Sequence, residues 1–412
     1  MVLKRGVVSR LTRESQLADH LETLVSKKTI YFPNLNGVRF IASFSVLIHH
    51  LEQVKEVFSL HNIYDNHLIK DMGKLGVGLF FVLSGFLITF LLLVEKNRKG
   101  KIELGNFYVR RVLRIWPLYL LVVLLAFFVF PHLSLFYDGR PAGYIYDADF
   151  YKRLALFLCM LPNFGFILYQ SPYLCAQTWS VGVEEQFYVL WPLVIGSATL
   201  IRALRPVVIY GLAIFCFSYV WITLDRANLS PEVVSNFTGH YLSQFRILTM
   251  IIGGLGSWLI FSKQVRVLAF LFRRDVQVIV YTTLVYCLGT GFYMSGVNLE
   301  FYALFFCFFI MNVAANPDSI INLEFPAISF LGKISYGTYM YHTAVIVLVI
   351  NCINRFLAPG LSAVAFNSIL YPLAIGLSVL VSALSYTYFE KPFLRVKERF
   401  GQFSKNSSPR SD

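Results

Sequence analysis

Apolar residues follow one another in ten long stretches along this chain, and short polar segments separate the stretches. A helix that crosses a bilayer needs about 20 consecutive, mostly apolar residues. Each stretch is close to that length. The pattern therefore predicts an all-α bundle of about ten transmembrane helices, at residues 36–54, 75–94, 113–130, 183–201, 206–224, 241–261, 276–295, 298–315, 333–353 and 369–389.

Composition agrees with a membrane protein. The chain has 412 residues, of which 57% are hydrophobic and only 14% are charged, whereas a soluble domain usually carries about 25% charged residues. The formal net charge is +13, but Lys and Arg lie between the apolar stretches rather than in one patch. This distribution is typical of the cytoplasmic loops of membrane proteins and does not favour a nucleic-acid partner.

The distribution of positive charge also predicts how the chain crosses the membrane. An eleventh apolar segment, 153–169, is interrupted by Pro162, Asn163 and Gly165. If it does not cross, 26 Lys and Arg residues lie on the inner side and 8 on the outer side. If it does cross, later loops change sides and the bias largely cancels. We therefore expect ten spans with both termini cytoplasmic.

These spans divide the chain into a domain and two tails. We expect a cytoplasmic tail at 1–34, a transmembrane domain at 35–392 and a second cytoplasmic tail at 393–412. The segment 131–182 is then an insertion on the outer face, and part of it could be re-entrant. Irregular backbone is tolerated at membrane depth only where protein or a water-filled cavity surrounds it.

The first span contains ionisable residues, which are costly inside a bilayer and usually functional. Arg39 and His50 are 11 residues apart, about three helical turns, so they share one face of a helix about 16 Å apart along its axis. His49 points about 80° away. A neutral imidazole can act as a general base near neutral pH. The alternative is a snorkelling arginine and a structural histidine.

The next two spans add small residues and a group of arginines. Ser84 and Gly85 in the second span allow close approach of a neighbouring helix or of a ligand. Arg110, Arg111 and Arg114 stand at the start of the third span, at spacings that let their guanidinium groups converge. Guanidinium groups bind phosphate in a bidentate manner. The group is therefore either a phosphate site or an ordinary positively charged anchor.

Two later segments carry further polar residues. Glu184 and Glu185 stand at the predicted outer end of the fourth span, beside Thr178, Trp179, Ser180 and Gln186, where they either act on a substrate or face external water. His342 lies about midway along the ninth span, among Tyr336, Tyr339 and Tyr341. It is either a functional residue or a buried hydrogen-bonding group. The six cysteines show no CxxC or metal-site spacing, and we expect no metal.

Taken together and in order, these segments resemble the membrane acyltransferase-3 family, which acylates polysaccharides and related glycans. The resemblance covers nearly the whole chain after about residue 32. The segments that carry it read NLNGVRFIASFSVLIHH, GVGLFFVLSGFLIT, RRVLRIWPLY, TWSVGVEEQFYVLWPL, LGKISYGTYMYHT and YFEKPF.

The resemblance implies roles for particular residues. The family pattern of an arginine, ten residues and a histidine falls on Arg39 and His50, and its Arg-x-x-Arg pattern, taken to serve the acyl-CoA donor, falls on Arg111 and Arg114. Two positions depart from the family. Many members carry aspartate at the position of Asn36 and often at that of Gly78; Asn36 can hydrogen-bond Arg39 but cannot neutralise its charge.

The sequence thus predicts an O-acyltransferase of a cell membrane, and we expect this to be the bacterial inner membrane. The enzyme would move an acyl group, expected to be acetyl, from cytosolic acyl-CoA to a glycan or lipid-linked glycan. Membrane lipids would surround it. We expect Arg110, Arg111 and Arg114 to hold the donor. The expected catalytic residues are His50, Arg39, Glu184 and Glu185, and the expected supporting residues are Asn36, Ser84, Gly85, Trp179, Ser180 and His342. Two alternatives are acylation of a small natural product and transport of a sugar or acyl species.

Overall fold

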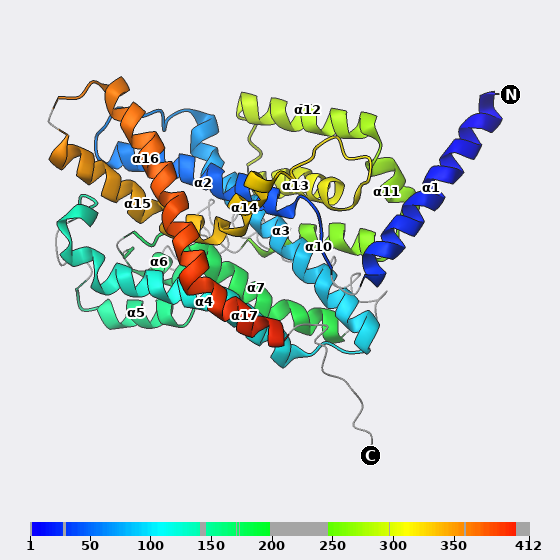
Figure 1. Ribbon diagram of the computed structural model, residues 1–412, viewed down its shortest axis with the longest axis horizontal. Helices are drawn as coiled ribbons and strands as arrows, with labels where there is room; N and C mark the ends of the chain where they lie inside the picture. Colours follow the sequence, from blue (N-terminus) through cyan, green and yellow to red (C-terminus); the bar gives the residue numbers. More distant parts are fainter. Residues whose placement is uncertain are drawn as a thin grey trace, which may run out of the picture.

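The computed structural model describes residues 2–27, 30–140, 146–169, 171–172, 174–197, 246–295, 297–357 and 360–400. All regular elements within these ranges are helices (Figure 1). They are α1 (Val2–Ser26), α2 (Leu35–Val57), α3 (His67–Lys99), α4 (Leu104–Phe128), η1 (Phe130–His132), η2 (Ser134–Phe136), α5 (Phe150–Leu158), α6 (Pro162–Leu168), α7 (Thr178–Ser197), α10 (Ile247–Phe261), α11 (Val265–Leu271), α12 (Arg274–Thr290), α13 (Asn298–Ala315), α14 (Pro326–Lys333), α15 (Ser335–Phe356), α16 (Ala363–Leu384), η3 (Ser385–Glu390) and α17 (Lys391–Arg399).

Each predicted span that falls on described residues coincides with a helix. In chain order, these helices are α2, α3, α4, α7, α10, α12, α13, α15 and α16. The predicted span 206–224 lies outside the described residues. The last apolar helix runs on past the predicted span, because η3 and α17 continue α16 without a break as far as Arg399.

Length and apolarity single out fewer helices as candidate membrane spans. Among the described residues, five helices are long and apolar enough to cross a bilayer, and the sixth candidate is α10 together with α11, which are bent by 115° at their junction. The helix α2 is not among them because its 23 residues include charged side chains such as Arg39 and Glu52, and the polar imidazoles of His49 and His50. The predicted site residues Arg39 and His50 therefore lie on one of the less apolar helices.

The segment 153–169 does not form one continuous helix. The helix α5 ends at Leu158 and α6 begins at Pro162, where proline is compatible with the first helical turn. The two helices have 9 and 7 residues, too few for either to cross a hydrocarbon layer by itself.

Within the described part of the N-terminal region, α1 is a packed helix rather than an irregular lead-in. Leu17, Leu21 and Leu24 are buried. Glu22 forms an ion pair with Lys263 at 3.2 Å, just before α11, and Arg98 donates to the carbonyl oxygen of Val25 near the end of α1. The predicted 1–34 tail thus contains a helix whose C-terminal half contacts the bundle.

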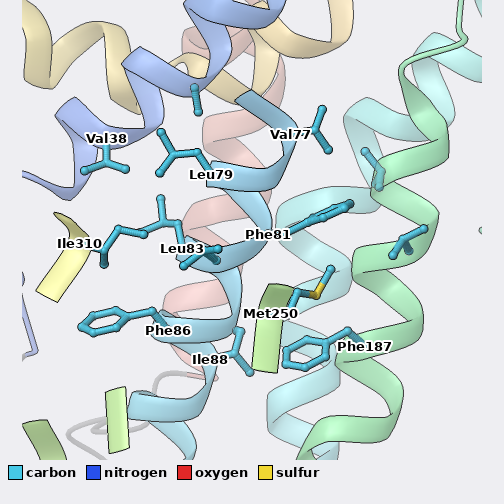
Figure 2. Close-up of a cluster of buried hydrophobic side chains, with 14 of the residues drawn as sticks. Val38, Val77, Leu79, Phe81, Leu83, Phe86, Ile88, Phe187, Met250 and Ile310 are labelled. Carbon is cyan, nitrogen blue, oxygen red and sulfur yellow. The ribbon is translucent and has the colours of Figure 1, made fainter. Parts of the chain in front are cut away.

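The centre of the bundle is α3, whose side chains pack on several neighbouring helices. Figure 2 shows Val38 of α2 and Ile310 of α13 on one side of α3, and Phe187 of α7 on the other. Gly85 explains how closely α10 approaches, because a Cβ atom there would lie only 1.9 Å from the carbonyl oxygen of Met250. Gly85 therefore serves helix contact and does not line a ligand site.

Candidate active site

A cavity of about 120 Å³ lies between α2, α3, α4, α7 and α15. Apolar side chains from α3 and α4 form much of its wall, as is usual for ligand sites. The polar side chains that line it come from all five helices, and they are Arg39, Ser84, Arg111, Arg114, Ser180, Glu184, Tyr188, Ser335, Tyr336 and Tyr339. Residues that are far apart in the sequence are thus brought to one place.

Three arginines of this cavity have no carboxylate within ion-pair distance among the described residues. Arg39 donates to Asn36 Oδ1 at 3.0 Å, which is the hydrogen bond expected from the sequence. The Arg111 guanidinium lies over the rings of Phe107 and Tyr188, 5.6 Å from each centroid, and its Nε is buried without a partner. A cationic, partly unsatisfied cavity of this kind is suited to an anionic ligand.

Arg110 was predicted to share the donor site, but the structure places it elsewhere. Its Nη2 lies 3.2 Å from Glu95 Oε2, and its Nη1 donates to the carbonyl oxygen of Phe400 at 2.8 Å. Both members of the ion pair are buried. Arg110 is therefore used to join α3, α4 and the end of α17, and it does not line the cavity.

Lys397 is a charged residue of this region that the sequence analysis missed. It lies on α17, close enough to Arg114, Arg111 and Arg39 for their positive charges to repel one another. The sequence assigned it to a cytoplasmic tail at 393–412 because α17 is polar, and no motif marked it. Only the packing of α17 beside α4 brings a fourth cation near the three arginines, although Lys397 is not itself a lining residue of the cavity.

Glu184 and Glu185 were expected at the outer rim, apart from the arginines, and the structure corrects this position. Glu184 lines the arginine cavity, where it accepts hydrogen bonds from Ser84 at 3.2 Å and from Tyr188 at 2.8 Å. Glu185 is buried and accepts from Trp116 Nε1 at 3.1 Å, while its Oε1 has no partner. The reason is that α7 packs beside α4, which brings Glu185 to Trp116, near the middle of α4.

His50 and His342, which the sequence could not connect, are in direct contact. His342 Nε2 lies 3.0 Å from His50 Nδ1. His50 is partly buried and is not a lining residue of the cavity, although Arg39 of the same helix is one. His342 in turn contacts the cavity residue Tyr339, with 5.9 Å between the ring centroids. The histidine pair therefore lies behind the cavity wall.

The remaining predicted site residues divide between lining and packing roles. Ser180 lines the cavity and lies 2.6 Å from the hydroxyl of Tyr339. Trp179 packs edge to face on Phe81, with 6.1 Å between ring centroids. Gly78, at which the sequence departs from the expected family pattern, faces Leu299 and Phe306 and so lies against α13 rather than in the cavity.

The described residues contain no group of three or more His, Cys, Asp or Glu side chains placed to hold a metal ion. Five cysteines fall within the described ranges, and all five are free thiols, including the exposed Cys159 and the buried Cys175.

Comparison with known proteins agrees with the family that the order of motifs resembles. A family model described as an acyltransferase domain matches residues 32–387, which is most of the chain. The chain belongs to the acyltransferase-3 family. It is 27% identical over 435 residues to the O-acetyltransferase OatA of Staphylococcus aureus strain NCTC 8325 / PS 47, a match that covers 93% of this chain and 62% of OatA.

OatA of Staphylococcus aureus strain COL matches with the same identity and coverage. Across these curated relatives from Staphylococcus aureus, the match extends over 58% to 62% of their length, so this chain spans about three fifths of each. No solved structure matches the chain.

Proposed function

We propose that this protein is a membrane O-acyltransferase that moves an acetyl group from acetyl-CoA to a hydroxyl group of a glycan. The observation that carries the proposal is the convergence of Arg39, Arg111 and Arg114, without carboxylate partners among the described residues, in one cavity of a family member. Coenzyme A is a phosphate-rich ligand, and guanidinium groups are the side chains best matched to phosphate. The names of the relatives support oxygen as the acceptor atom.

The positions of Arg39 and His50 on α2 also support two separate roles, donor binding at Arg39 and base catalysis at His50. Arg39 lies at the cavity, and His50 lies about 16 Å further along the same helix. A donor held by its phosphates at the arginines would extend its thioester arm along α2 toward His50. His50 would then remove the proton from the acceptor hydroxyl as that oxygen attacks the thioester carbonyl carbon. Glu184, held by Ser84 and Tyr188, would orient the donor or the acceptor within the cavity.

The decisive experiment measures binding of acetyl-CoA to the detergent-purified protein by calorimetry. The variant Arg111→Ala plus Arg114→Ala removes two cavity cations, and Arg266→Ala plus Arg274→Ala removes two exposed arginines as a matched control. We expect the cavity variant to lose binding and the control to keep it. Equal affinity of all three proteins would overturn the donor assignment. Failure of a folded wild-type protein to bind would favour another acyl donor.

The topology with ten spans and two cytoplasmic termini is part of the same proposal, and the charge distribution supports it. It puts the segment 131–182 on the outer side of the membrane. Cys159 in this segment is exposed, so it is a built-in reporter of sidedness. A membrane-impermeant maleimide should label intact cells through Cys159 and not label the Cys159→Ser variant. Labelling of Cys159 only after the cells are opened would refute the topology.

A further inference from the structure

The contact between His50 and His342 determines which nitrogen of each ring carries a proton. His342 Nδ1 lies 2.7 Å from the carbonyl oxygen of Tyr339 and 3.2 Å from that of Thr338. A carbonyl oxygen can only accept, so His342 Nδ1 carries a hydrogen. On the other ring, His50 Nδ1 lies 3.0 Å from the carbonyl oxygen of Val46, and by the same reasoning it also carries a hydrogen.

These two assignments fix the bond between the rings. Since His50 Nδ1 is a donor, His342 Nε2 at 3.0 Å must be the acceptor. His342 is therefore neutral, with its hydrogen on Nδ1 and its lone pair on Nε2. The Nδ1–H group of His50 is shared between His342 Nε2 and the Val46 carbonyl oxygen. In neutral His50, the remaining nitrogen, Nε2, then has no hydrogen and presents a lone pair.

The structure assigns His342 as a positioning residue that holds His50 in the tautomer needed for base catalysis, an assignment that rests on the proposed function. The chain runs from the Tyr339 carbonyl oxygen through His342 to His50. In catalytic triads, a third group orients the catalytic imidazole, and that group is often a carboxylate. Here the neutral imidazole of His342 takes the place of the carboxylate and orients His50. Because His342 is 1% exposed, a neutral partner avoids a buried, unpaired negative charge.

The proton balance of the transfer follows from this tautomer. His50 Nε2 takes the hydroxyl proton while the acceptor oxygen forms a bond to the acyl carbon. The bond between that carbon and the coenzyme A sulfur then breaks. The thiolate that leaves takes the proton back from His50 Nε2, so His50 returns to its starting state. While His50 is an imidazolium, its Nδ1–H still donates to His342 Nε2, and no other group needs to move.

His49 provides an internal contrast. Its Nδ1 lies 2.9 Å from the carbonyl oxygen of Ile69, and its ring lies against Gly73 of α3. This histidine packs α2 on α3, and its ring lies edge to face with that of His50, with 5.0 Å between the centroids and without the hydrogen bond that His342 makes. His49→Gln is therefore the control for a histidine change beside His50 that leaves the His50–His342 hydrogen bond in place.

The test compares His342→Gln with His342→Leu in acetyl transfer, with KM for acetyl-CoA measured separately from kcat. The Gln side chain can place its carbonyl oxygen near the position of Nε2 and accept from His50, whereas Leu cannot. We expect Leu to lower kcat by about 100-fold to 1,000-fold, within the range for loss of correctly oriented base catalysis. We expect Gln to stay within about tenfold of wild type, and neither change to move KM for acetyl-CoA by more than about twofold.

Two results would overturn the assignment. One is equal loss of kcat in the Gln and Leu variants while both still bind acetyl-CoA, because the ability to accept a hydrogen bond would then not matter. The other is normal kcat in the Leu variant. The variant His50→Ala separates this inference from the proposed function. Full activity of His50→Ala removes His50 as the base, whereas an inactive His50→Ala beside an active His342→Leu removes only the positioning role.

Discussion

Arg110 and Arg111 are neighbours in the sequence, yet the fold uses their identical side chains in different ways. Arg110 is buried in an ion pair with Glu95 and donates to the Phe400 carbonyl oxygen. Arg111 is turned about 100° around α4, lies over two aromatic rings in the cavity and keeps an unpartnered Nε. One guanidinium group is satisfied within the protein, and the other has a buried Nε without a partner, which is why we propose it as a ligand contact.

The difference shows that a cluster of arginines is not by itself a binding site. A buried charge with a partner stabilises the native packing once both groups have left water, whereas a buried charge without a partner raises the free energy of the empty protein. A ligand that supplies the missing negative charge recovers that cost. The distinction between Arg110 and Arg111 can be tested by removing each in turn.

Arg110→Ala should have the largest effect, and the effect should be on stability. It removes the ion pair from the buried Glu95 carboxylate, which keeps the hydrogen bond from the Glu103 N–H. Removal of one member of a buried ion pair typically costs about 3–5 kcal/mol in free energy of unfolding. Thermal unfolding in detergent should show the loss as a lower Tm. The double variant Arg110→Ala plus Glu95→Gln should recover part of it, because the uncompensated charge is gone. An Arg110→Ala protein of unchanged Tm that cannot bind acetyl-CoA would contradict this prediction, because Arg110 would then serve ligand binding and not stability.

Arg111→Ala should have the next largest effect, on acetyl-CoA affinity and not on stability. Loss of one charge-assisted contact is worth about 1.5–3 kcal/mol, or roughly 10-fold to 100-fold in Kd. We expect a Tm equal to or above that of the wild type, because an unsatisfied buried charge is removed. Calorimetry and thermal unfolding on the same preparation measure both quantities. A large fall in Tm with unchanged Kd would mean that Arg111 is structural.

Lys397→Ala should have the smallest effect. The ammonium group lies near the arginines on a less buried helix, so we expect only about twofold to fivefold weaker acetyl-CoA binding, as for a solvent-screened charge of about 1 kcal/mol or less. The difference from wild type should shrink as salt is raised. Lys391→Ala, at an exposed position of the same helix, is the control. Equal affinities for wild type and Lys397→Ala at low salt would exclude Lys397 from the site.

Much of the site was visible in the sequence because it depends on local spacing. Eleven residues place Arg39 and His50 on one face of any helix, and the Asn36 amide is three residues from Arg39, within reach on the same face. Both relations hold in α2. The helices themselves could be predicted for the same reason, since uninterrupted apolar stretches leave the backbone no partner in a bilayer other than itself.

What the sequence could not predict depends on which helices pack together. Spacing along α4 made Arg110 as good a cavity residue as Arg111, and only Glu95 of α3 decides between them. Glu184 was predicted far from the arginines, because its depth follows from the packing of α7 beside α4. Lys397 had no motif, and its place depends on η3 and α17 continuing α16 past the predicted end of the last span.

The sequence by itself determined the long apolar helices among the described residues, the order of the motifs and the family, since each of these depends on side-chain type and on spacing along one segment. The tertiary structure alone decided which charges are paired and which are open, and that His342 of α15 meets His50 of α2. The physical reason is the distance over which each interaction acts. Helical periodicity and hydrophobicity act within one helix, whereas hydrogen bonds and ion pairs between helices act over about 3 Å and depend on how the helices pack.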